Sequence, residues 1–446
     1  MTTPEEPVPT AGSGQGSLQR LIGVRGLALT AINTTVGAGI FGLPALVAAD
    51  MGASAPIGYI VTALLFFCVV LCFAEAGSRV SSAGGLYAYS SAAFGPFAGS
   101  FVGTLLWFGN GALSNAAVAV LMVNGLALAF PALGEPLGRN LTLIVVYASL
   151  AAINIRGLKP GLRVTEGITV IKLLPLVLLA VVGLATLNWS QIALPSLPDT
   201  GQLGRGIVLL TFAFMGIETS LSPSAEIRDP TRVVPRGLAI ALLGITALYF
   251  SLQLVAQGTL GDGLAGATGA PLAATASIVL GGWGRVLILG AGVACMAGVL
   301  PGDLMCTPRV LYAMGRDGLL PARLGVVHSR FNTPAAAIIT YCLVCAALAL
   351  SGTFKSLAVL AAASTLVMYL FTAIAVLVLR RRGVNLGQPA FVIPGGPVVP
   401  VIAAVAIIAV LSTLAWRELA AIGVMLAVSS VPFFWRTANR STEVVP

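Results

Sequence analysis

The stretch Val36-Gly37-Ala38-Gly39-Ile40-Phe41-Gly42-Leu43-Pro44 lies inside an apolar run that extends from about Leu27 to Ala49. Three glycines and a proline disfavour an uninterrupted helix, because glycine loses more backbone freedom than alanine and proline lacks the N–H that a helix needs. We therefore predict a break between Gly37 and Gly42. Measured from Arg25, the break falls about 18 Å along the helix, near the middle of a hydrocarbon core about 30 Å thick.

Backbone groups freed at that depth need partners from the protein, from water or from a ligand, because lipid offers none. The stretch is therefore a candidate binding site. The alternative interpretation is that its small residues only let a neighbouring helix approach closely, as small residues often do in membranes.

The composition of the whole chain supports a membrane environment. Hydrophobic residues make up 57% of the 446 positions and charged residues only 9%, which excludes a soluble globular class. Repeated apolar runs predict about twelve spans. They lie near residues 26–48, 54–77, 93–127, 138–155, 165–187, 206–226, 236–257, 283–315, 335–351, 356–379, 395–415 and 417–435.

The basic residues predict the orientation of these spans. With the N-terminus inside, 18 of the 24 Lys and Arg residues fall on the cytoplasmic side and 5 on the other, and Lys172 lies within a span. This bias indicates both termini in the cytoplasm of a multi-pass inner (plasma) membrane protein. The net charge of +9 thus reflects topology, and we expect no nucleic-acid partner.

Lys172 is unusual because of its depth. It lies nine residues beyond Arg163, or about 14 Å along a helix, too deep for its ammonium to reach the membrane surface easily. A charge at that depth costs several kcal/mol and usually faces a cavity or a partner. We expect a functional role for Lys172.

The sixth predicted span carries a second interruption. The segment from Phe212 to Ile217 contains Gly216 and is followed directly by Glu218, at mid-depth between two arginines. The two broken spans lie five helices apart. Because five is odd, a repeat of spans 1–5 by spans 6–10 must have inverted topology, and transporters built this way bind substrate at broken helices near the midplane.

The predicted fold is an all-α membrane protein with about twelve transmembrane helices and a five-plus-five inverted repeat in which helices 1 and 6 are discontinuous. The expected division is a disordered cytoplasmic tail at 1–19, the first repeat at 20–190, the inverted second repeat at 200–380, helices 11 and 12 at 390–436, and a cytoplasmic tail at 437–446.

Three other polar positions have open interpretations. Asn110, near the middle of the third span, either contacts substrate or bonds between helices. Asp303, if ionised and facing a pocket, would favour substrates with a second cationic group; alternatively it is protonated or paired with Arg309. Glu75 lies one turn from Arg79, and we expect these two to form a structural pair.

Four short motifs occur in order along the chain. They are Gly37-Ala-Gly-Ile-Phe-Gly42; Gly84-Gly85-Leu-Tyr87-Ala-Tyr89; Phe212 to Glu218 with Arg228-Asp-Pro230; and Arg309-Val-Leu-Tyr312 with Asp317-Gly-Leu-Leu-Pro321. Together they resemble the amino acid-polyamine-organocation superfamily of permeases over nearly all of residues 20–436. The resemblance implies the inverted-repeat fold of the leucine transporter with two extra C-terminal helices.

The resemblance also implies how a substrate is held. N–H groups of the first break, here Ala38, Gly39 and Ile40, receive its carboxylate, and carbonyl groups of both breaks receive its ammonium. The substrate-binding set predicted in this way, with Asp303 added, is Thr34, Gly37, Ala38, Gly39, Ile40, Asn110, Phe212, Ala213, Met215, Gly216 and Asp303.

Further roles follow from the same resemblance. The aromatic residue matching Phe212 closes over the substrate, and the position matching Asn110 contacts its side chain. Lys172 falls where many members carry a lysine that replaces the second sodium ion of sodium-coupled relatives. Glu218 matches an acid linked to gating or pH response. At the position that matches Asp303, the arginine-agmatine exchangers carry a tryptophan gate, so this chain differs from them at that position.

These features predict a secondary amino acid transporter that is sodium-independent, works by alternating access as a proton symporter or exchanger, and carries neutral L-amino acids. The alternative is a carrier of cationic amino acids or polyamines that uses Asp303. A non-transporting amino-acid receptor and a membrane enzyme are the rivals from other classes; the second lacks a metal-ligand or nucleophile cluster in the sequence. No cofactor or metal is expected. The lipid bilayer, protons and a second copy of the chain are candidate partners.

Overall fold

The computed structural model describes residues 22–80, 86–157, 162–187, 198–221, 227–384 and 391–442. Every regular element in these ranges is a helix, and one isolated bridge joins Ile22 to Ile227. The prediction of an all-helical chain is thereby confirmed. The tail expected at 1–19 lies outside the described residues, and helix α16 continues into the range of the second expected tail.

The first half of the chain contains α1 (Val24–Thr35), α2 (Gly39–Met51), α3 (Ala55–Arg79), α4 (Leu86–Phe94), α5 (Pro96–Thr104), the π-helix η2 (Leu105–Ala112), α6 (Leu113–Ala127), α7 (Pro136–Ile155) and α8 (Leu162–Thr186). The second half contains α9 (Thr200–Phe214), the 3-10 helix η5 (Ile217–Leu221), α10 (Pro230–Leu260), α11 (Pro271–Val279), α12 (Gly282–Arg316), α13 (Ala335–Ser351), α14 (Phe354–Arg381), α15 (Val398–Leu411) and α16 (Trp416–Thr442).

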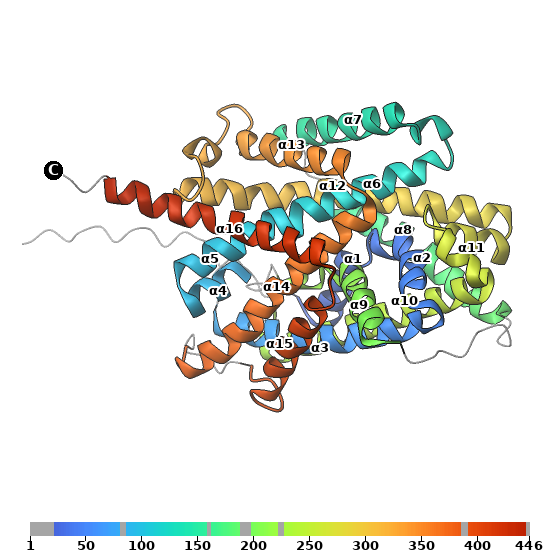
Figure 1. Ribbon diagram of the computed structural model, residues 1–446, viewed down its shortest axis with the longest axis horizontal. Helices are drawn as coiled ribbons and strands as arrows, with labels where there is room; N and C mark the ends of the chain where they lie inside the picture. Colours follow the sequence, from blue (N-terminus) through green and yellow to red (C-terminus); the bar gives the residue numbers. More distant parts are fainter. Residues whose placement is uncertain are drawn as a thin grey trace, which may run out of the picture.

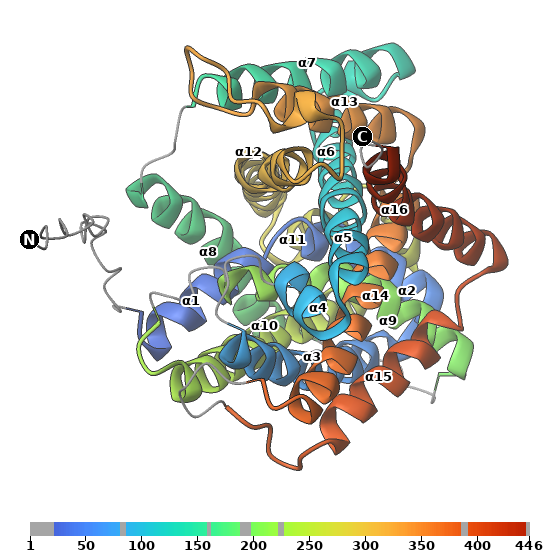
Figure 2. The ribbon, with the colours of Figure 1, turned by 90° about the vertical axis from the view of Figure 1, so that its left-hand side faces the viewer.

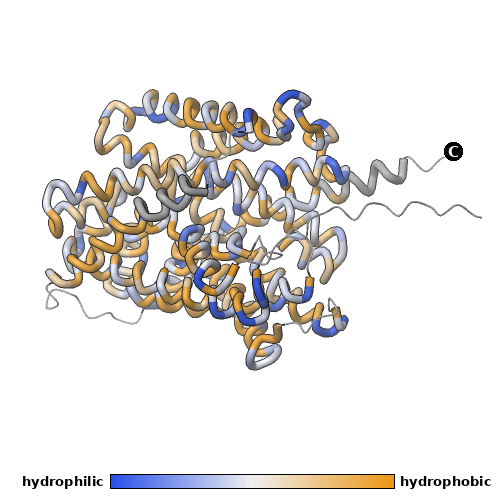
Figure 3. The backbone as a smooth tube through the Cα atoms, turned by 180° about the vertical axis from the view of Figure 1, so that it is seen from behind, coloured by the Kyte–Doolittle hydropathy of each residue, from blue (hydrophilic) through white to orange (hydrophobic). Residues whose placement is uncertain are grey.

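Many of these helices suit a membrane. Within the described residues, seven helical stretches are long and apolar enough to cross one, and α15 with α16 makes an eighth if this pair, bent by 119°, is a single span. Hydrophobic residues run along nearly all of them (Figure 3). Each of the twelve predicted spans overlaps at least one helix, while the count of twelve crossings stays a prediction.

The helices form a bundle with an outer layer. Figures 1 and 2 both show α7 and α13 stacked outside α6 and α12. Helix α7 exposes apolar side chains such as Leu137 and Val145. Helix α14 lies in the interior, in contact with α3, α6, α9 and the π-helix η2. Its buried face carries the polar residues Ser364, Thr365 and Tyr369, so α14 brings hydrogen-bonding groups into the core.

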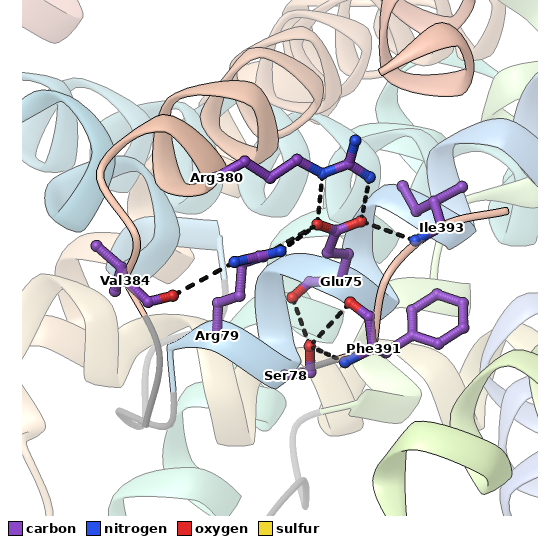
Figure 4. Close-up of polar contacts among 7 residues, drawn as sticks. All are labelled: Glu75, Ser78, Arg79, Arg380, Val384, Phe391 and Ile393. Carbon is purple, nitrogen blue, oxygen red and sulfur yellow. Dashed lines mark hydrogen bonds and ion pairs between the residues drawn. The ribbon is translucent and has the colours of Figure 1, made fainter. Parts of the chain in front are cut away.

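At one end of the bundle, a buried carboxylate ties α3 to α14 (Figure 4). The Glu75 side chain is fully buried and accepts hydrogen bonds from Arg79, as expected from their spacing, with a closest distance of 2.8 Å. Arg380 of α14 also bonds to it, at 2.5 Å, and the backbone N–H of Ile393 donates to it at 2.9 Å. The backbone N–H of Phe391 likewise donates to the hydroxyl of the neighbouring Ser78. The cluster therefore fixes residues 391–393 as well as two helices.

Candidate functional site

The first span is interrupted as predicted, over a shorter stretch. Helix α1 ends at Thr35 and α2 begins at Gly39, so residues 36–38 lie outside both helices. Gly42 is part of α2, and its lack of a side chain has a packing reason: a Cβ there would lie 2.8 Å from the Phe354 ring and 2.9 Å from Leu121. No side chain caps α2, which leaves its first N–H groups available to a ligand.

The sixth span is also interrupted. Helix α9 ends at Phe214, and Gly216 takes a left-handed conformation with φ of +101° before η5 begins. The N–H of Gly216, which a continuing helix would direct at the carbonyl of Phe212, donates instead to Glu218 Oε2 at 3.0 Å. The break therefore removes the helical partner of the Phe212 carbonyl.

The two interruptions touch each other. A Cβ on Gly39 would lie 2.8 Å from Cα of Ala213, and one on Gly216 would lie 2.5 Å from the carbonyl oxygen of Thr34. Only glycine allows backbones to approach this closely. Two segments separated by about two fifths of the chain therefore meet at one place, which contains most of the predicted substrate-binding set.

Tyr249 of α10 bridges the two breaks and was missed by sequence reasoning. Its hydroxyl lies 3.3 Å from the carbonyl oxygens of both Thr35 and Ala213 and can donate to either. The residue is fully buried, with its ring against Tyr59 and Phe214. One signal was present in the sequence: Tyr249 and Gln253 are polar residues one turn apart in an apolar span, and such residues face the bundle interior.

Lys172 of α8 reaches the first break. The residue is 4% exposed, and its ammonium donates to the carbonyl of Asn33 in the last turn of α1. From α12, the Cys295 thiol contacts the carbonyl of Val36 at 3.9 Å. The deep lysine therefore faces a backbone oxygen at the break rather than the membrane surface.

Two further predicted residues are linked through α14. The Asn110 amide donates to the Thr365 hydroxyl at 3.0 Å, and Glu218 Oε2 accepts from Tyr369 at 2.8 Å. Thr365 and Tyr369 lie one turn apart on α14, so its buried face connects Asn110 with the second break. Asn110 lies in the π-helix η2, and its bond to Thr365 explains why a polar residue interrupts the apolar pattern there.

Phe212 lies in the last turn of α9. The residue is 7% exposed, and its ring packs edge-on against Phe354 at the start of α14, with 5.8 Å between ring centres. Thr34 is exposed, as is Thr30 one turn earlier on α1. An open hollow at the start of α1 is lined by residues 22–26, Thr30 and Arg228. One face of α1 is therefore accessible from that end of the bundle.

Asp303 makes its hydrogen bonds away from the two breaks. Its carboxylate accepts from Thr307 at 2.5 Å, Tyr341 at 2.5 Å and Asn115 at 2.8 Å. The pairing with Arg309 offered as an alternative is wrong, because Arg309 donates to the carbonyl of Leu304 instead. The physical reason is distance along the helix: Thr307 is one turn from Asp303, and Arg309 points to another face.

Comparisons with known proteins identify the family of the chain. A family model described as amino acid permease matches residues 22–438. The branched-chain amino acid permease BcaP of Bacillus subtilis is 28% identical over 97% of this chain and 96% of its own length. BcaP of Lactococcus lactis subsp. cremoris is 29% identical over 83% and 84%. A methylthioribose transporter of Bacillus subtilis is 28% identical over 97% and 96%.

Proposed function

Because the chain belongs to the amino acid permease family, within the amino acid-polyamine-organocation superfamily, we propose that it is a sodium-independent secondary transporter of neutral L-amino acids that works by alternating access. Its relatives are named as permeases and transporters, so the chain is a membrane transporter and not an enzyme. The observation that carries the proposal is the direct contact between the two helix breaks at Gly39 and Gly216.

In this proposal the breaks recognise the amino acid backbone common to all substrates. The uncapped start of α2 has N–H groups and the positive end of a helix dipole, which suit a carboxylate. The Tyr249 hydroxyl lies between the carbonyls of Thr35 and Ala213 and donates its one proton to either of them. We therefore assign the substrate ammonium to the carbonyl of Phe212, which has lost its helical donor, and to that of Met215.

The choice of neutral substrates rests on the surroundings of Asp303. Its carboxylate already accepts three hydrogen bonds from uncharged groups, so it has little capacity left for a substrate cation. Two relatives are named for branched-chain amino acids, which fits an apolar subsite closed by Phe212. The alternative, transport of cationic amino acids or polyamines, requires Asp303 to leave these partners.

Uptake by purified protein in liposomes tests the function directly. The panel contains branched-chain, small neutral and basic amino acids, a diamine, and methylthioribose, because one relative is named for it. We expect uptake of neutral amino acids without sodium. Comparing vesicles with and without a proton gradient, and with and without internal substrate, separates symport from exchange. Preference for the basic amino acid or the diamine would favour the alternative.

Lys172→Ala is expected to lower the uptake rate about 10- to 150-fold, because a hydrogen bond from a charged group contributes about 1.5–3 kcal/mol and here it holds the end of α1. Initial rates in sodium-free vesicles measure the effect. Lys355→Ala is the matched control, since that lysine makes a half-exposed pair with Asp50, and it should transport normally. Sodium-dependent uptake by the wild type would contradict the role proposed for Lys172.

Tyr249→Phe is expected to lower kcat/KM about 3- to 10-fold, because one hydrogen bond of about 0.5–1.5 kcal/mol between the breaks is lost. Tyr59→Phe is the control: it is equally buried, but its hydroxyl bonds to Gln253 and not to a break. A concentration series of uptake on both variants gives the comparison. Equal losses would show that the bridge has no special role.

The remaining assignments complete the proposal. Glu218 and Tyr369 link the second break to α14, and we assign them to gating. The apolar runs support twelve crossings of the inner membrane, and the charge distribution supports both termini in the cytoplasm. The odd spacing of the two broken spans supports inverted repeats at 20–190 and 200–380. Helices α15 and α16 expose apolar residues such as Val405 and Val424 and form a candidate dimer surface, which cross-linking in native membranes tests.

A further inference from the structure

Asp303 is the centre of a buried hydrogen-bond cluster that the proposed transport cycle does not use. Thr307 comes from its own helix α12, Tyr341 from α13 and Asn115 from α6. Asn115 in turn accepts from Tyr147 of α7 at 3.0 Å. Tyr341 is fully buried, and Asn115 and Tyr147 are each 3% exposed. One carboxylate therefore connects four helices.

Two of the side chains that bond to Asp303 also pack against the π-helix η2. A Cβ on Gly111 would lie 2.6 Å from Cγ2 of Thr307 and 3.1 Å from the hydroxyl of Tyr341. The hydrogen bonds to Asp303 fix where these two side chains point. Asn115, four residues after Gly111, bonds to the same carboxylate. Asp303 thus holds the segment 111–115 at both of its ends.

The other side of η2 faces α14. A Cβ on Gly109 would lie 2.5 Å from Cβ of Ser364, and Asn110 donates to Thr365. The π-helix η2, which carries Asn110, therefore packs between α14 on one side and the Asp303 cluster on the other. A π-helix is a rare conformation and persists where its surroundings support it, often at a functional site.

We propose that Asp303 is a positioning residue for substrate selectivity: through Thr307, Tyr341 and Asn115 it holds the π-helix so that Asn110 faces the side-chain end of the substrate. This rests on the proposed function and on the expectation from the sequence that Asn110 contacts the substrate side chain. The three donors are uncharged, so the carboxylate acts as a hydrogen-bond acceptor here. Its role requires acceptor oxygens and does not require a cationic substrate.

The test uses two substitutions at the same position. Asp303→Leu keeps the branched shape of the side chain, with methyl groups in place of the oxygens, and removes every acceptor. It is expected to raise KM for leucine about tenfold, while KM for alanine changes less than about twofold, because losing hydrogen bonds worth about 1.4 kcal/mol changes affinity tenfold. Asp303→Asn keeps an acceptor oxygen and can donate to Thr307, so it is expected to stay within about threefold of wild type for both. Asp262→Leu, at an exposed site in the 3-10 helix 261–266, is the matched control.

A double-mutant cycle with Asn110→Ala makes the test specific. If Asp303 acts through Asn110, Asp303→Leu adds little to the KM for leucine once Asn110→Ala is present. Where Asp303→Leu does not fold, Tyr341→Phe takes its place in the cycle, because it removes one donor from Asp303 without changing shape. Its expected effect is about threefold on leucine, again absent in the Asn110→Ala background.

Other outcomes overturn the inference. Equal loss for leucine and alanine, or additive effects in the cycle, would assign Asp303 to folding or gating. Selective loss of a basic amino acid in both Asp303→Leu and Asp303→Asn would show a direct charge contact with substrate. Failure of the proposed function is recognised separately, because the wild-type protein would then take up neither leucine nor alanine.

Discussion

We expect Gly39→Val to abolish amino acid uptake. The added Cβ would lie 2.8 Å from Cα of Ala213 and 3.2 Å from its Cβ. The nearer atom belongs to the backbone of α9, so it cannot move aside as the end of a flexible side chain could. The substitution therefore separates the two breaks, and it also shields the N–H groups at the start of α2 from a carboxylate. Misplacement of about 1 Å at such a site costs about a hundredfold or more in rate.

Gly290→Val is the matched control, because that glycine lies in α12 with no atom within 4 Å of its would-be Cβ. It should keep wild-type uptake. Gly39→Ala should fall between the two, since it adds the clashing atom without the branches. Uptake is compared after gel filtration has shown that each variant is folded. Normal uptake by folded Gly39→Val would mean that substrate binds away from the breaks.

Of the variants proposed here, we expect Glu75→Ala to lose the most stability. Removing this carboxylate leaves Arg79, whose side chain is 8% exposed, and Arg380, at 17%, without their acidic partner (Figure 4). Breaking a buried ion pair from one side costs about 3–5 kcal/mol, because the remaining charge is left uncompensated. The N–H of Ile393 loses its acceptor as well. Thermal unfolding of the purified protein in detergent should show a midpoint lowered by several degrees.

Two further variants serve as comparisons for Glu75→Ala. Glu75→Gln keeps acceptor and donor groups at the same place and should lose less than Glu75→Ala. Asp50→Ala breaks a pair in which Lys355 is 47% exposed, and partly exposed pairs contribute about 1 kcal/mol or less. An unfolding midpoint of Glu75→Ala equal to that of Asp50→Ala would show that the cluster does not stabilise the fold.

Several features could be predicted from the sequence because they depend on neighbours in the chain. The helix breaks follow from the backbone freedom of glycine at Gly37, Gly39 and Gly216, whereas Pro44 lies inside α2. The Glu75–Arg79 pair follows from the spacing of one helical turn. The depth of Lys172 follows from helical rise and from the cost of a buried charge, which together predicted that it meets a partner inside the bundle.

The identity of most partners depended on the tertiary structure. Arg380 lies 305 positions from Glu75, and Tyr249 lies 214 positions from Thr35. No local pattern encodes which of many polar residues in apolar helices will meet across such separations, because that depends on how the helices cross and rotate. Asp303 shows the consequence. Its sequence neighbours suggested Arg309 as a partner, whereas the packing of α6 and α13 against α12 supplied Asn115 and Tyr341. The sequence by itself determined where the helices break and which side chains need partners, and only the packing of the helices decided which groups meet.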